Sequence, residues 1–206
     1  TSTTGLTQAD MQGLRYRTVG NANGTGAITW RVTDSGSGTT PNVNVLNESL
    51  SISVAAVNDA PALQGSLPSF AAVLEDSAAS AKTLGLSSIT GYGVGGGSDE
   101  SGQTLSYSIT AIPGFIELFK ADGSTSVTTS TTGLTLAELR GLTYKTVANA
   151  NGTGTLSWNV VDSGSGTAPN VNTLSQSLSL TVTAVNDQPT LSGALPSFAA
   201  VLEDSA

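Results

Sequence analysis

Ser177-Leu-Ser-Leu-Thr-Val-Thr-Ala184 alternates polar and apolar residues at every step. Successive side chains of a β-strand point to opposite faces, so this stretch predicts a strand with one apolar and one polar face. Such a strand suits an antiparallel sheet that covers a hydrophobic core on one side only. The segment therefore favours an all-β fold.

The same alternation marks two further stretches of the chain. Their apolar members are Leu105, Tyr107, Ile109, Leu156, Trp158 and Val160. Short strands separated by Gly, Asn, Asp and Ser turns, with no long helical period, are typical of a β-sandwich. We expect Trp158 and Tyr107 near the centre of its core.

The chain repeats with a period of 128 residues. Leu67-Pro-Ser-Phe-Ala-Ala-Val-Leu-Glu-Asp-Ser-Ala78 returns letter for letter at residues 195–206, and residues 1–78 align with 129–206 without a gap, 55 of the 78 positions being identical. A fixed period of this kind indicates a tandem array of modules. The chain is therefore expected to be a window of a longer array.

The module boundary is expected at Ala56-Val-Asn-Asp-Ala-Pro61 and its copy Ala184-Val-Asn-Asp-Gln-Pro189. A proline directly after a strand prevents the ladder from continuing and sets an extended exit. We therefore divide the chain into residues 1–58, the C-terminal part of one repeat, residues 59–187, a complete repeat, and residues 188–206, the start of the next.

The composition excludes several functions. The chain has no histidine and no cysteine, which rules out Ser-His or Cys-His catalysis, ordinary zinc sites and disulfides. Seven basic against fifteen acidic residues give no basic face for nucleic acid or anionic lipid. No run of eighteen apolar residues predicts a membrane span. A bound metal would have to be a hard, oxygen-bound cation such as calcium or magnesium.

One short helical turn is expected in each module. Thr135-Leu-Ala-Glu138 fits a capping box, and Thr7-Gln-Ala-Asp10 keeps an acid at the same position. Gly141 is placed to end the turn in a left-handed conformation. Asp34 and Asp162 each precede a Ser-Gly pair and are candidates for capping an Asx-turn.

The pairs Asn23-Gly24 and Asn151-Gly152 permit two interpretations. Each belongs to an Asn-Gly-Thr triplet, which matches a glycosylation acceptor. Each also lies just before a predicted strand, where Asn-Gly is a preferred tight-turn pair. Turn chemistry favours the second interpretation.

Several motifs together carry a family resemblance. Val-Asn-Asp-Ala-Pro at a module end, Asn149-Ala-Asn-Gly-Thr-Gly154, Asp162-Ser-Gly and Leu74-Glu-Asp76 occur at a fixed period, with Glu100-Ser-Gly-Gln-Thr-Leu-Ser-Tyr107 between them. This combination resembles the cadherin-like or immunoglobulin-like tandem repeats of giant bacterial extracellular adhesins, including those of the RTX type. The resemblance covers essentially the whole chain and implies stacked sandwiches on a bacterial cell surface or in the extracellular space.

The resemblance also implies calcium ions at the module junctions. In the cadherin pattern, acids near the module start, acids of a mid-module loop and the Asn-Asp of the linker supply the ligands. Mapped onto this chain, the metal ligands are Asn58, Asp59, Glu75, Asp76, Asp99, Glu100, Asn186, Asp187, Glu203 and Asp204. Related repeats often read Asp-x-Asp-Ser-Gly, whereas this chain has Ser98-Asp-Glu-Ser-Gly102, with a hydroxyl in place of one carboxylate.

The residues alone give a weaker argument for calcium. Glu75-Asp76 and Asp99-Glu100 concentrate negative charge where chain reversal is expected, and adjacent carboxylates repel unless they are solvated or bridged by a cation. The competing interpretation is that these acids only solvate loops and keep a weakly charged chain soluble.

Three classes of function follow. The first is a structural extender of a secreted or cell-surface adhesin, with modules stacked end to end and stiffened by calcium, whose partners are neighbouring repeats and other copies in a surface filament. The alternative is a glycan- or protein-binding sandwich, for which Tyr92 in the Gly-rich loop is the lone exposed aromatic candidate. An enzyme is disfavoured because no pair of carboxylates occupies distinct environments.

Overall fold

The structure is a computed structural model that describes residues 5–78, 80–201 and 203. Its elements follow one another in the order α1 (Gln8–Gln12), β1 (Gly24–Thr33), β2 (Val45–Val54), β3 (Ala62–Gln64), β4 (Val73–Leu74), β5 (Lys82–Thr83), the 3-10 turn η1 (Leu86–Ser88), β6 (Gly91–Gly93), β7 (Leu105–Ala111), β8 (Ile116–Phe119), β9 (Ser126–Val127), α2 (Leu136–Arg140), β10 (Thr143–Thr146), β11 (Gly152–Asp162) and β12 (Thr173–Thr183).

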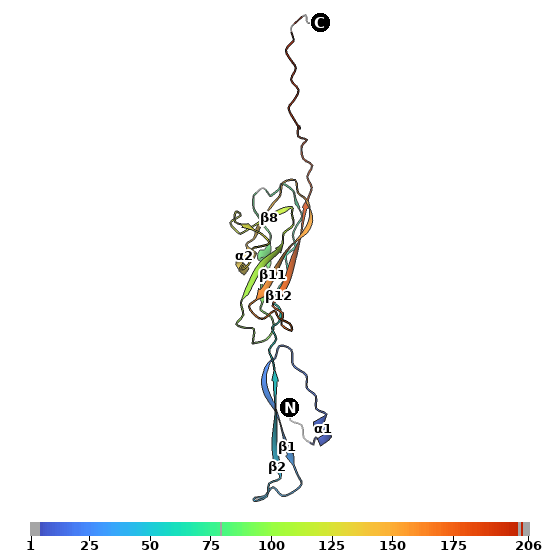
Figure 1. The fold of residues 1–206 in the computed structure, drawn as a ribbon, viewed down its shortest axis with the longest axis vertical. Coiled ribbons are helices and arrows are strands. Elements are labelled where there is room, and N and C mark those ends of the chain that lie inside the picture. Colours follow the sequence, from blue (N-terminus) through green and yellow to red (C-terminus); the bar gives the residue numbers. More distant parts are fainter. Residues whose placement is uncertain (1–4, 79, 202, 204–206) are drawn as a thin grey trace.

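Strands β3 to β12 build one layered β structure, in the middle of the elongated molecule in Figure 1. One sheet has the order β4-β12-β11-β7 and another the order β5-β10-β8-β9, while β3 pairs with β6. All pairs are antiparallel except β4 with β12, which is parallel. The described chain is thus mostly β, with short helices only, which agrees with the predicted all-β, sandwich-type fold.

The apolar faces of the predicted strands form the core. Trp158 of β11 and Tyr107 of β7 are almost fully buried, at 0% and 2% exposure, as expected. The indole Nε1 of Trp158 donates a 3.1 Å hydrogen bond to the hydroxyl of Tyr92. The buried indole N–H thus has a hydrogen-bond acceptor inside the apolar core.

Tyr92 itself contradicts one expectation. It lies on β6 and is 8% exposed, because β6 pairs with β3 through Leu63 opposite Tyr92. Its ring also lies 5.6 Å from that of Tyr107. The aromatic candidate for an exposed sugar platform is therefore a core residue.

The 128-residue repeat is visible in the strand register. Strand β1 pairs with β2 from Gly24 opposite Val54 onward, and β11 pairs with β12 from Gly152 opposite Val182, which are the positions 128 residues later. In the first copy, β1 and β2 form a two-stranded sheet, apart from β3–β12 at the lower end of Figure 1. Its inner face is uncovered: Leu50 is 56% exposed, whereas its counterpart Leu178 is 4% exposed.

The short helices form as predicted but end differently. Thr135 and Glu138 cap α2 reciprocally, and Thr7 and Asp10 do the same for α1, so both capping boxes are confirmed. The left-handed ending is wrong: Gly141 has φ −86° and stays right-handed, and its N–H closes onto the carbonyls of Ala137 and Leu139. The glycine is instead suited to a close approach, since a Cβ there would lie 3.1 Å from that of Ala121.

The turns before β1 and β11 are centred on residues 20–21 and 148–149, three residues earlier than the Asn-Gly pairs. The N–H of Ala150 donates to the carbonyl of Val147 over 3.2 Å, and Asn149, with φ +54°, supplies the left-handed residue. Gly152 already belongs to β11. The Asn-Gly pair therefore does not form the tight turn. The side chain of Asn151 instead donates a hydrogen bond to Glu75.

Candidate functional site at the module junctions

The first junction contains residues 21–23, 56–61, 95–103 and the start of the Asp162-Ser-Gly loop. Asn58 is buried there at 8% exposure. Its side-chain N–H groups donate to Asp162 over 3.2 Å and to the carbonyl of Val171 over 2.7 Å, and its Oδ1 accepts from Gln103 over 2.5 Å. Asn58 therefore fastens the linker to the following module with its amide.

Sterics explain why a glycine, Gly164, occupies the third position of the Asp162-Ser-Gly loop. A Cβ at Gly164 would collide with Oδ1 of Asn58 and come within 2.8 Å of Nε2 of Gln103. The N–H of Gly164 donates to Oδ1 of Asp162 over 2.7 Å, and Gly36 donates in the same way to Asp34. The predicted Asx-turns at both aspartates are confirmed.

Glu100 is the most unusual carboxylate of this junction, because it is only 1% exposed. One oxygen, Oε1, accepts a hydrogen bond from the backbone N–H of Asp59. The other, Oε2, is buried and finds no hydrogen-bond donor among the described residues. A buried carboxylate oxygen without a donor is costly, so its position would suit a bound cation.

Gly95 makes room for this carboxylate. It has φ +127°, and a Cβ there would collide with Oε2 of Glu100 and lie 2.7 Å from the carbonyl oxygen of Asp59. Both oxygens therefore lie so close to the glycine that no side chain fits there. Carboxylate and carbonyl oxygens are the donor types that calcium prefers.

Asp99 connects this loop to the preceding module. Its Oδ1 accepts a 2.7 Å hydrogen bond from Nδ2 of Asn23. A Cβ at Gly97, where φ is +92°, would lie 3.1 Å from the carbonyl oxygen of Asn21. One at Gly96 would collide with Nδ2 of Asn21 and lie 3.0 Å from Oδ2 of Asp59. Oxygens of Asp59, Asp99, Glu100 and Asn21, together with the amide nitrogen of Asn21, thus lie around the glycine run 95–97.

The second junction contains the equivalent residues of the other module end. Glu75 is 4% exposed and accepts hydrogen bonds from the backbone N–H of Val185 over 2.7 Å and from Nδ2 of Asn151 over 2.9 Å. These donors, the Val185 N–H first and the Asn151 amide second, hold the pKa of Glu75 below its usual 4.5. Glu75 is therefore an ionised, positioned carboxylate at neutral pH.

The remaining predicted ligands of this junction are more exposed. Asp76 has φ +62°, and its Oδ1 accepts from the N–H of Asn149 over 3.4 Å. Asn186 and Asp187 are exposed, and Nδ2 of Asn186 donates to the carbonyl of Asp187 over 3.4 Å. Of the pair predicted for the following junction, Glu203 is exposed and Asp204 lies outside the described residues.

The two junctions show complementary halves of one arrangement. Asn23 and Asn151 are equivalent by the repeat, yet Asn23 contacts Asp99 of the following module, whereas Asn151 contacts Glu75 of its own module. Superposed by the 128-residue period, one junction would hold both partners around a single asparagine. Within either half, no group of three or more Asp, Glu, His or Cys side chains of the described residues is arranged to hold a metal ion.

Residues that the sequence patterns did not single out as site residues organise both junctions. Asn23, Asn151 and Gln103 supply side-chain donors, and Gly95 supplies the space. The signal was available in the run Asn149-Ala-Asn-Gly-Thr-Gly154, where an asparagine that is not needed for the turn recurs at each period.

Comparison of the chain with protein-family models and with curated proteins gave no match. No helix in the described ranges is long and apolar enough to cross a membrane. The fold and the two junctions together define an all-β protein of sandwich type, built on a 128-residue repeat with polar contacts between successive units.

Proposed function

We propose that the chain is a structural extender: a stack of cadherin-like or immunoglobulin-like modules from a bacterial surface or secreted adhesin, whose junctions are stiffened by calcium. The observation that carries the proposal is the buried carboxylate of Glu100, whose Oε2 lacks a hydrogen-bond donor among the described residues. This oxygen and the carbonyl oxygen of Asp59 both lie close to Gly95. A divalent cation there would neutralise the carboxylate and join linker and module.

The complementary half-sites support the same proposal. A complete junction would add carboxylates of the Glu75 and Asp76 type to Asp59, Asp99 and Glu100. That set supplies enough oxygens for one or more calcium ions, which take six to eight each. Such a cluster would repel itself strongly without a cation, so calcium binding would be coupled to alignment of neighbouring modules.

An extender also agrees with the exposed surface of the complete module. Tyr92 and Trp158 are buried, so neither can serve as a stacking platform for a sugar. Tyr92, the aromatic residue that the sequence suggested for glycan binding, is therefore not available on the surface of this module. Repetition, contact between successive units and burial of the aromatics are what a stalk requires.

Calcium titration into chelator-treated protein tests the proposal. The expected result is a rise in the melting temperature and a longer particle by small-angle scattering. Glu100→Gln should raise the melting temperature in chelator, because the buried charge is removed, and should abolish the calcium response. Glu48→Gln is the matched control, since Gln176 occupies the equivalent position naturally. Identical calcium responses of both variants would exclude Glu100 as a ligand.

A further inference from the structure

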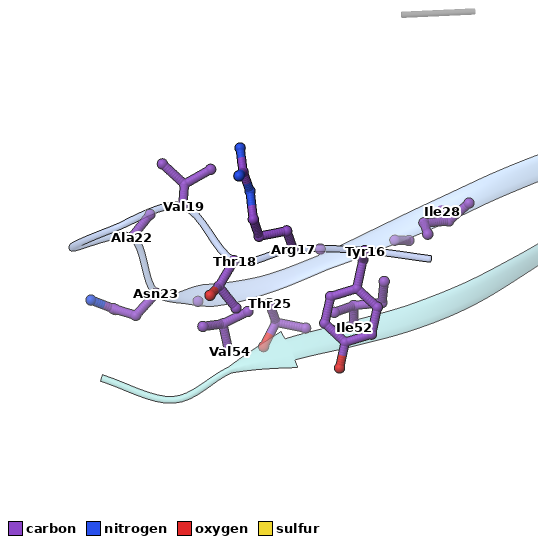
Figure 2. Close-up of a pocket in the computed structure, with 13 residues that line it drawn as sticks. Tyr16, Arg17, Thr18, Val19, Ala22, Asn23, Thr25, Ile28, Ile52 and Val54 are labelled. Atoms are coloured by element: carbon purple, nitrogen blue, oxygen red, sulfur yellow. The ribbon is translucent and has the colours of Figure 1, made fainter. Parts of the chain in front are cut away.

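The uncovered face of the first hairpin is a large apolar surface. Ile28 and Val32 are 40% and 52% exposed, whereas their counterparts Leu156 and Val160 are fully buried at 0%. At one end of this face lies a groove of about 460 Å³, lined among others by Tyr16, Ile52 and Val54 and shown in Figure 2.

A second exposed apolar segment lies at the other end of the molecule. Leu195, Phe198 and Val201 are 76%, 100% and 83% exposed in the extended segment at the upper end of Figure 1. We name residues 195–203 the tail. Two exposed apolar surfaces on one chain raise the question whether they fit each other.

The complete module shows how the tail sequence binds when it is docked. Residues 67–78 have the same twelve letters as residues 195–206. There Phe70 packs edge-on against Tyr144, with ring centroids 5.4 Å apart, and Val73 pairs in parallel with Val182 of β12. The N–H of Glu75 donates to the carbonyl of Thr183 over 2.9 Å.

The residues that contact segment 67–78 have counterparts in or next to the β1–β2 hairpin. Tyr144 corresponds to Tyr16, which is 75% exposed, and Val182 corresponds to Val54, at the free edge of β2. Asn151 corresponds to Asn23. An amide nitrogen carries two N–H donors, so Asn23 can keep its bond to Asp99 and offer the second to another carboxylate.

We propose that the tail of one copy docks on the β1–β2 hairpin of a second copy, with Phe198 on Tyr16, Val201 beside Val54 and Glu203 on Asn23. The hairpin and the tail lie at opposite ends of the chain in Figure 1, so the occupant is a second copy. Because different surfaces meet, the contact is heterologous and does not close on itself, and it produces an open end-to-end filament.

The docked tail adds a strand to the free edge of β2 and covers the part of the apolar face nearest Tyr16. It also places Glu203 near Asp99, across from Asn23, which reproduces both partners of the asparagine in one junction. The proposal rests on the proposed function for the equivalence of the modules, and its apolar contacts do not require the ion.

Sedimentation of the whole chain, with and without calcium at ~0.15 M salt, tests the assembly. The expected result is a mass that grows with concentration beyond twice the monomer mass of 20.5 kDa. Phe198→Asp, Val201→Asp and Tyr16→Asp should each return the protein to monomer. Ala199→Asp is the matched control, because its counterpart Ala71 is exposed in the docked segment.

A cross-link fixes the register. The chain has no cysteine, so Val54→Cys with Val201→Cys should give a ladder of disulfide-linked oligomers on oxidation, while Val54→Cys with Ala199→Cys should not. A monomer at all concentrations, or a closed dimer that persists in a chain ending at Ala194, would overturn the proposal. If the unmodified chain does not assemble but the calcium response is intact in Glu48→Gln and lost in Glu100→Gln, the docking proposal is wrong and the extender proposal stands.

Discussion

The side-chain amide of Asn151 donates a 2.9 Å hydrogen bond to Oε2 of Glu75, which lies 76 residues earlier in the chain. Because the backbone N–H of Val185 donates to the other oxygen, Glu75 ties the start of β11 to the residues that follow β12. The carboxylate near the module start is therefore held in place by elements from the module end.

Replacing Asn151 by Asp should destabilise the protein in chelator. The donor to Glu75 would be lost and a second carboxylate would face the first at 2.9 Å, where like charges repel. The urea midpoint should fall without calcium and recover largely with it. Asn159→Asp is the matched control on the same strand, since Oδ1 of Asn159 only accepts, from Ser175. Equal midpoints of the two variants in chelator would contradict the prediction.

The stability of the complete module should depend on Glu138 in acid. The N–H of Thr135 first, then Lys120 and the Thr135 hydroxyl, lower the pKa of Glu138 from 4.5 to about 2. A carboxylate with a lowered pKa in the folded state stabilises above the unfolded value, and this contribution disappears as the pH falls from 4.5 toward about 2.

Glu138→Gln should therefore melt at a lower temperature at neutral pH and show a smaller loss between pH 4.5 and about 2 than the unmodified chain. The effect should be modest, because the carboxylate is partly exposed and its ion pair with Lys120 is screened. Glu117→Gln changes the charge equally on an exposed position of β8. Parallel melting curves for both variants across this range would contradict the assignment.

Gly95→Ala should cost about 2–4 kcal/mol of folding free energy, measured by chemical denaturation. The added Cβ would meet the Glu100 carboxylate and the Asp59 carbonyl, and φ at this position is +127°. Gly102→Ala, seven residues further, should stay within about 0.5 kcal/mol, since a Cβ there meets no described atom within 4 Å. A neutral Gly95→Ala would show that the loop can move away from Glu100.

Tyr92→Phe should cost about 1–3 kcal/mol, because it leaves the buried Nε1–H of Trp158 without its acceptor. Tyr144→Phe is the matched deletion of a hydroxyl from a buried tyrosine, one that accepts no hydrogen bond from any described residue, and should cost less. A double-mutant cycle of Tyr92→Phe, Trp158→Phe and the combined variant, measured by denaturation, would isolate the Trp158–Tyr92 coupling.

Local patterns predicted the local structure. The strands around Tyr107, Trp158 and Val182 follow a period of two, and the caps at Thr135 and Thr7 depend on residues three positions apart. The internal repeat appears in the structure as two hairpins with one register.

Features that depend on distant partners were missed or wrong. Tyr92 lies in a glycine-rich stretch, residues 91–97, and its burial depends on the pairing of β6 with β3, which no local pattern encodes. Gly141 ends its helix right-handed beside Ala121 from a separate segment. The donors Asn23 and Asn151 reach carboxylates 76 residues away, and no local pattern encodes these contacts.

The two hairpins that share a register also compete during folding. Residues 59–128 lie between them in the chain and supply the strands that cover the inner face of β11–β12, whereas that of β1–β2 is exposed. Because the two hairpins share one register, we expect that the middle segment of residues 1–206 can also pack on the equivalent face of β1–β2 during refolding. We expect a chain starting at residue 59 to refold faster and with higher yield than residues 1–206, because it lacks the competing β1–β2 hairpin.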